Sequence, residues 1–246
     1  MKKLLSLLLA LVLCMGALVA CGKDGTKEGT GEEEGLSPTH GLVYTPTEDG
    51  TAFVVTGMGT AKGTDIVISP TYDGKPVVAI AKSAFVSQKA LTSVTLPASV
   101  TRIEANAFSG CAALASVTLS EGLTAIGDYA FAGCASLTAV TLPATLTQMG
   151  TGAFSRCAAL PAIELPVGVT GVAKYAFLGC KKLASVTIPA GVTRIEGSAF
   201  SACAALTAIR YGGTLAAWEA IEKGYVWDNG TGAYTVTATD GSAAKQ

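Results

Sequence analysis

The sequence predicts a mainly β repeat solenoid, in which short turns of chain stack on one another and share one core. Three observations support this fold class. A block of 23 residues recurs six times, each block holds a short run of alternating apolar and polar residues, and bends rich in Gly and Ala follow. A period of this length is typical of solenoids, because one unit cannot bury its apolar face alone. We therefore expect six stacked turns over residues 65–211, with a cap at each end.

The first 20 residues have the layout of an export signal peptide. Lys2 and Lys3 come first, and an apolar run extends from Leu4 to Ala20. The segment LVAC, residues 18–21, resembles the lipobox of bacterial lipoproteins, which implies cleavage before Cys21 and a lipid on its thiol. The alternative is an uncleaved membrane-spanning anchor, for which the run is just long enough. In both cases most of the chain lies in the bacterial cell envelope, outside the cytoplasm, and is attached to a membrane.

Residues 21–39 are expected to form a flexible tether that starts at the lipidated Cys21. Residues 22–39 contain almost no apolar side chains and show no periodicity. Such a segment cannot bury enough surface to offset the entropy lost on ordering. Loss of residues 1–20 would leave 15 basic and 18 acidic residues, with no basic stretch to neutralise phosphates. We therefore expect membrane contact through the lipid anchor alone, and no nucleic-acid partner.

The N-terminal end of the stack needs a cap, because an open solenoid exposes strand edges and core. Residues 40–64 are expected to supply it, and residues 43–55 read as a hairpin about Asp49-Gly50. Ile66 and Ile68 are then expected to begin the first stacked strand.

The strand of each repeat is represented by the segment SVTLP, residues 93–97. Val94 and Leu96 are expected to point inward and Thr95 outward, and the proline ends the strand. Equivalent strands should stack in register as a parallel sheet, about 4.8 Å apart. A second short strand is expected near residues 101–103, and a tight helical turn near residues 107–111. One inward position, followed six residues later by Leu, is filled by Phe85, Phe108, Phe131, Phe154, Phe177 and Phe200.

Residues 212–246 are expected to form the C-terminal cap. Thr214 can N-cap a helix that carries Leu215, Trp218 and Ile221 on one face. Trp218 also continues the series of Ile positions at the 23-residue spacing. We therefore expect it to occupy that inward position and to plug the last turn.

The repeat L-x-x-V-x-L-P-x-x-V-x-x-I-x-x-x-A-F-x-x-C resembles the BspA-type leucine-rich repeat, common in surface proteins of host-associated bacteria and protists. The flanks fit as well. TYDGKPVVAI at 71–80 resembles the usual start of the first repeat, and GTLAAWEAIEKGYVW followed by YTVTATDG resembles a frequent closing cap. The resemblance implies a leucine-rich-repeat-like stack closed by a helix and a hairpin. The asparagine of other leucine-rich repeats is missing, so their horseshoe curvature is not assumed; its positions hold Ser99, Gly122, Thr145, Gly168 and Gly191.

Five cysteines share one repeat position, namely Cys111, Cys134, Cys157, Cys180 and Cys203. Metal sites use close pairs such as C-x-x-C, and a catalytic thiol needs a histidine, whereas the only histidine is His40. Adjacent turns could bring two cysteines within disulfide range, so bridging remains an alternative, although five is an odd number. The interpretation we favour is a small buried hydrophobe under a tight bend.

No other segment has the pattern of a catalytic or cofactor site. GMGTAKG at 57–63 misses the spacing of phosphate-binding glycine loops. Glu104, Asp128 and Glu196 fall at exposed turn positions, where they favour solubility rather than acid–base catalysis. Four cations are expected to form a solvated face rather than an anion site, namely Arg156, Lys174, Lys181 and Lys182. We predict no enzyme activity, no cofactor and no metal site.

The resemblance implies a lipid-anchored interaction module at the cell surface, adhesin-like or scaffold-like, that binds a protein or a glycan. The alternative is a structural or accessory lipoprotein of the envelope without a host ligand. We expect a monomer that presents a flat face of small residues about 30 Å long. The alternative explanation is that Thr and Ser are present only because they suit exposed strands. If the sheet face is not the binding site, the next candidate surface is the side of the turns that carries Tyr129 and Tyr175. The predicted contact row on the outer face of the main sheet is Thr95, Thr118, Thr141, Glu164, Thr187 and Arg210.

Overall fold

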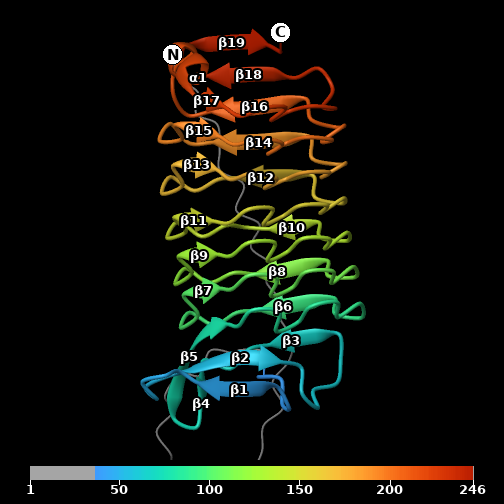
Figure 1. Ribbon diagram of the computed structural model, residues 1–246, viewed down its shortest axis with the longest axis vertical. Coiled ribbons are helices and arrows are strands. Elements are labelled where there is room, and N and C mark those ends of the chain that lie inside the picture. The colour runs from blue at the N-terminus through green and yellow to red at the C-terminus, as the bar shows by residue number, and fades with distance from the viewer. Residues whose placement is uncertain (1–36, 246) are drawn as a thin grey trace, which may run out of the picture. The chain divides into compact units, whose positions relative to one another are not determined.

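The computed structural model describes residues 37–245. The predicted signal peptide, Cys21 and the tether up to residue 36 lie outside the described residues. From Thr39 onward the chain winds into a stack of short turns, with strands on two sides of each turn (Figure 1). The predicted solenoid is confirmed. We call the strands on these two sides sheet 1 and sheet 2.

The predicted N-terminal hairpin is confirmed. Strand β1 (Val43–Pro46) pairs antiparallel with β2 (Phe53–Gly57). The Asp49 carboxylate holds the bend, because it accepts hydrogen bonds from the Thr47 hydroxyl at 2.6 Å and the Thr51 amide at 3.1 Å. Strand β2 then pairs parallel with β5 (Lys75–Ile80), and β4 (Thr71–Tyr72) pairs antiparallel with β5. The cap therefore continues sheet 2 rather than only covering the core.

Sheet 1 carries the strand predicted from SVTLP. Its strands pair in parallel with equivalent residues side by side, as Val94 pairs with Val117. This register is set by the constant 23-residue period, because a slip by one residue would turn every apolar side chain outward. The strands of sheet 1 are β3 (Asp65–Val67), β6 (Ser93–Thr95), β8 (Ser116–Thr118), β10 (Ala139–Val140), β12 (Ala162–Glu164), β14 (Ser185–Ile188), β16 (Ala208–Tyr211) and β18 (Thr235–Ala238).

Sheet 2 contains the second strand that was expected near residues 101–103. After β2 and β5 it runs through two-residue strands whose second residue is buried in five of the six. A tight turn with hydrogen bonds such as Cys111 N to Phe108 O, 3.2 Å, follows each repeat's strand. These strands are β7 (Arg102–Ile103), β9 (Ala125–Ile126), β11 (Gln148–Met149), β13 (Gly171–Val172), β15 (Arg194–Ile195) and β17 (Glu222–Lys223).

The core is built from ranks of identical side chains. The six phenylalanines are fully buried, and each ring stacks nearly parallel on the next with centroids 5.1–5.9 Å apart. The largest of these spacings, 5.9 Å, separates Phe154 from Phe177. Stacking of identical residues at one period therefore produces a continuous apolar column through the six repeats.

Both sheets are interrupted at the same step of the stack, which we call the seam. Sheet 1 is unpaired between β10 and β12, and sheet 2 is unpaired between β11 and β13 (Figure 1). In neighbouring turns Thr138 N donates to Ala115 O at 3.0 Å, and Ala184 N donates to Pro161 O at 2.8 Å. Pro161 has no N–H, so it cannot make the equivalent bond to the turn before it. The predicted parallel stacking therefore holds on both sides of this step and is broken at it.

The tight turns hold the chain together across the seam. Phe154 N donates to Ala176 O at 2.9 Å, and Arg156 N donates to Leu178 O at 2.6 Å. At the seam, the strands of both sheets are therefore unpaired, and hydrogen bonds between the tight turns join the two parts of the stack.

The C-terminal cap contains the predicted helix, α1 (Leu215–Ala220), with Thr214 as its N-cap. Trp218 is buried, but the expectation that it occupies the Ile position is wrong: Lys223 pairs with Ile195 instead. The helix lengthens this turn, since Ala208 pairs with Thr235, 27 residues later, instead of 23. The closing hairpin is confirmed, because β18 pairs antiparallel with β19 (Gly241–Ala244).

Candidate functional site

The predicted contact row lies on the outer face of sheet 1, and every one of its side chains is half-buried or exposed. Thr95 pairs with Thr118, and Thr187 pairs with both Glu164 and Arg210. The seam separates Thr141 from Glu164. The row is therefore two segments, and the expectation of one flat face is wrong.

A cavity of about 540 Å³ opens on sheet 1 at the seam; we call it the sheet 1 cavity. Four members of the predicted row line it, namely Thr141, Glu164, Thr187 and Arg210. Its apolar wall includes Leu142, Leu165 and Val167, and Val167 is 80% exposed. The interruption thus converts part of the predicted flat face into a concave site with a carboxylate, a guanidinium and hydroxyls at an apolar wall.

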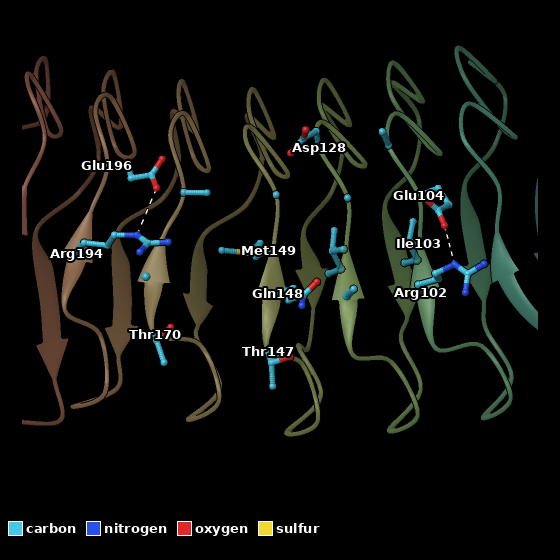
Figure 2. Close-up of a pocket in the computed structure, with 17 residues that line it drawn as sticks. Arg102, Ile103, Glu104, Asp128, Thr147, Gln148, Met149, Thr170, Arg194 and Glu196 are labelled. Atoms are coloured by element: carbon cyan, nitrogen blue, oxygen red, sulfur yellow. Dashed lines mark hydrogen bonds and ion pairs between the residues drawn. The ribbon is translucent and has the colours of Figure 1, made fainter.

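A second cavity, of about 670 Å³, opens on sheet 2 across the same seam (Figure 2). We call it the sheet 2 cavity. Ion pairs lie at its two ends, Arg102 with Glu104 at 2.6 Å and Arg194 with Glu196 at 3.4 Å. Figure 2 shows Gln148 between them. The lining between the ion pairs includes several small residues, namely Ala125, Gly127, Gly150, Gly171 and Ala173.

The sequence also contains a signal for the sheet 2 cavity, which is not among the predicted sites. Arg102 and Arg194 share one repeat position, and Glu104 and Glu196 share another, whereas the repeats between them carry Ala, Gln and Gly. Large charged residues at both ends of a run of small ones predict a depression. Exposed ion pairs of this kind stabilise a fold by at most about 1 kcal/mol. They therefore remain open to a polar ligand.

The carboxylates considered earlier have structural partners. Asp128 Oδ1 accepts a hydrogen bond from Thr151 N at 2.7 Å, and Glu196 Oε2 accepts one from Lys174 N at 3.0 Å. Each links its own turn to a neighbouring one. Their role is thus more than solubility, and neither faces the other as a general acid or base would.

The five repeat cysteines are all free and buried, as the packing interpretation predicts. Each thiol donates to the carbonyl oxygen of the phenylalanine in the preceding turn, with S···O distances of 3.0–3.3 Å. Burial raises the pKa of the Cys111 thiol to about 11. These thiols are poor nucleophiles and poor metal ligands, because both roles need the thiolate.

Metal and membrane features were sought along the same part of the chain. Residues 37–245 contain no cluster of three or more His, Cys, Asp or Glu side chains that could hold a metal ion. Within this range, no helix is long and apolar enough to cross a membrane.

Comparison with known proteins places the repeat in a family. The family model described as "BspA type Leucine rich repeat region" matches residues 78–207 in six copies. No curated protein sequence matches the chain.

Two of the solved structures that are similar to the chain are described here. The leucine rich repeat protein of T. pallidum is 32% identical, with a TM-score of 0.69, over 76% of this chain and 85% of that one. A protein described as a leucine rich cell surface protein from Faecalibacterium prausnitzii is 28% identical, with a TM-score of 0.67, over 85% of this chain and 56% of that one. With its six matched repeats stacked as described, the chain belongs to the BspA-type leucine-rich repeat family.

Proposed function

We propose that this protein is a cell-surface interaction module, held at the bacterial envelope by a lipid on Cys21, that binds a protein or a glycan. The observation that supports binding most directly is the sheet 1 cavity. Four side chains predicted from the sequence as ligand contacts gather there around one concave surface. None of them belongs to the buried core, so their side chains are accessible to a ligand.

The lining of the sheet 1 cavity suits an extracellular ligand with both polar and apolar groups. Leu142 and Leu165 offer apolar surface next to the Arg210 guanidinium and the Glu164 carboxylate. Sites of this size with a few polar groups set in apolar walls are typical of ligand binding. The relative from Faecalibacterium prausnitzii, described as a cell surface protein, supports an extracytoplasmic location.

A matched pair of variants tests this proposal. The full-length protein in mild detergent is first incubated with extracellular matrix proteins, mucin and cell-wall fractions to find a ligand. Thr187→Arg then places a large charged side chain in the cavity, whereas Thr95→Arg makes the same change at the equivalent position on β6, outside it. We expect Thr187→Arg to weaken binding at least tenfold and Thr95→Arg to leave it unchanged.

The other outcomes are equally informative. If both variants bind as tightly as the parent, the cavity is not the contact site. If no fraction contains a ligand, the alternative applies, namely an accessory or structural lipoprotein of the envelope without a host ligand.

A further inference from the structure

A third cavity, of about 470 Å³, lies along the tight turns and shares no lining residue with either sheet cavity; we call it the turn cavity. Tyr129, Arg156 and Tyr175 line it, each from a different repeat. Small residues make up most of the remaining lining, namely Ser109, Gly110, Ala132, Gly133 and Ser155. Two aromatic rings and a guanidinium therefore surround a largely small-residue surface.

The backbone at these three residues is in the left-handed region, with φ values of 54°, 60° and 60°. The turns require this conformation because it directs amides along the stack, as in the bond from Tyr129 N to Thr151 O at 2.8 Å. Bulky side chains rarely adopt it. In the other repeats the equivalent positions hold small or turn-favouring residues, namely Ser83, Asn106, Gly152 and Ser198 for the tyrosines and Ser87, Gly110, Gly133, Gly179 and Ala202 for the arginine.

These unfavourable residues converge on one surface. Among residues 37–245, one other bulky side chain with this backbone lies in a tight turn, Val226 in the last turn, and it does not line the cavity. Residues kept in a poorly populated conformation cluster at functional sites. Gly152 contributes as well, because a Cβ atom there would collide with the Tyr129 ring. The equivalent positions of three successive repeats hold Tyr129, Gly152 and Tyr175. The glycine thus leaves room for the Tyr129 ring over the next turn.

The charge of the turn cavity is positive. Arg156 is exposed and forms no ion pair with any side chain in residues 37–245. The Lys174 ammonium lies over the Tyr175 ring, 4.9 Å from its centroid. The carboxylates of Asp128 and Glu196, which accept backbone hydrogen bonds, line the sheet 2 cavity and not this one. The cations expected to be only a solvated face are thus partly gathered at an aromatic surface.

We infer that the turn cavity binds a carboxylated sugar unit of an acidic glycan. Tyrosine rings offer flat, rigid surface with a hydroxyl at the edge, which suits a sugar ring that has both apolar and hydroxyl faces. The Arg156 guanidinium can hold a carboxylate through two parallel hydrogen bonds. This site is separate from the sheet 1 cavity, so either proposal can fail without the other.

The test uses the full-length protein in mild detergent and three acidic glycans, namely polygalacturonate, hyaluronan and polysialic acid. Methyl-esterified polygalacturonate serves as the neutral match, and polyglutamate as an acidic chain without sugar rings. Arg156→Gly installs the residue found at Gly110, Gly133 and Gly179, so the fold should be at least as stable as before. Tyr129→Asn installs the residue found at Asn106. Tyr225→Asn, at an exposed tyrosine outside the cavity, is the control.

We expect at least one acidic glycan to bind, with at least tenfold weaker binding to Arg156→Gly and to Tyr129→Asn. The Tyr225→Asn control should bind like the parent, and the methyl ester should bind at least tenfold more weakly than the acid. The unfolding temperature of Arg156→Gly should be equal or higher. Absence of binding to all three glycans, equal binding by Arg156→Gly, or stronger binding of polyglutamate would each overturn the inference.

Discussion

The cysteine rank illustrates how one residue type serves the stack at the level of single atoms. Cys is small enough to fit beneath the tight turn, and its thiol donates a weak hydrogen bond to a carbonyl of the turn before it. Ala would fill similar space without the donor. The thiols are fully buried. Each can donate its hydrogen bond only while it is protonated. The stability of the fold should therefore depend on pH in alkaline solution.

The stability of the protein should fall steeply in alkaline solution. Burial raises the pKa of Cys111 to about 11 and that of Cys203 to about 12, and raises the pKa of the three cysteines between them. Above the ordinary thiol pKa of about 8.5, the unfolded chain releases these protons and the folded chain keeps them. The free energy of unfolding should therefore fall with rising pH, by about 1.4 kcal/mol per unit for each thiol.

Over about two pH units, the loss from five such thiols is comparable with the whole free energy of unfolding of a typical domain. Urea unfolding at pH values from about 7 to 10 measures the slope, and Cys111→Ala should reduce it. A thiol reagent should find the five repeat cysteines unreactive at neutral pH until the chain is denatured. A free energy of unfolding that does not change over this range would contradict the prediction.

The seam is the feature that matters most at the level of strands. A proline at one position removes one donor, and the sheet 1 pairing is interrupted at that step. The equivalent positions hold Thr92, Ala115, Thr138, Ala184 and Thr207, all of which have an N–H. Pro161 therefore accounts for one missing hydrogen bond on the sheet 1 side of the seam, whereas sheet 2 is interrupted at the same step between β11 and β13.

Pro161→Thr should close the seam on sheet 1. A new bond would contribute about 1 kcal/mol, whereas loss of proline from the unfolded chain costs about the same. Overall stability is therefore a poor measure, and hydrogen exchange is the better one. We expect amides of β12 to exchange at least tenfold more slowly in the variant, and the sheet 1 cavity to shrink in its structure. Pro189→Thr, at a proline outside the seam, is the control and should not slow exchange of β12.

At the level of the whole molecule, stability is a sum of contacts between neighbouring turns. The phenylalanine column runs through the six repeats, and each ring stacks on the phenylalanine rings of the neighbouring turns. Damage to one turn should therefore spread to its neighbours first. Because the strands are unpaired at the seam, we expect local unfolding to spread less across it.

Phe131→Ala should lower the free energy of unfolding by about 3 to 5 kcal/mol, because it removes a fully buried ring and leaves a cavity. Exchange of amides should rise most in β8, β9, β10 and β11, on the N-terminal side of the seam. Limited proteolysis and hydrogen exchange would locate the opening. A uniform rise along the whole stack would mean that the turns unfold as one unit.

The proposed anchor decides where the whole molecule resides. Cys21→Ala removes the sulfur to which the lipid would be attached, so the variant should remain unprocessed and carry no lipid. Metabolic labelling with a fatty acid and mass analysis of the N-terminus report the change. Ser6→Ala, in the same leader, is a control that should be processed normally. Normal cleavage and lipid labelling of the Cys21 variant would disprove the anchor.

The sequence by itself determined the solenoid, the inward ranks, both hairpins and the N-cap at Thr214, because each depends on local periodicity or turn chemistry. It also identified Thr141, Glu164, Thr187 and Arg210 as outward residues. Only the tertiary structure decided that these four surround a cavity, that Lys223 rather than Trp218 pairs with Ile195, and that Tyr129, Arg156 and Tyr175 line one cavity. The reason is physical: a repeat specifies which way a side chain points, whereas the distance between turns depends on every hydrogen bond that joins them.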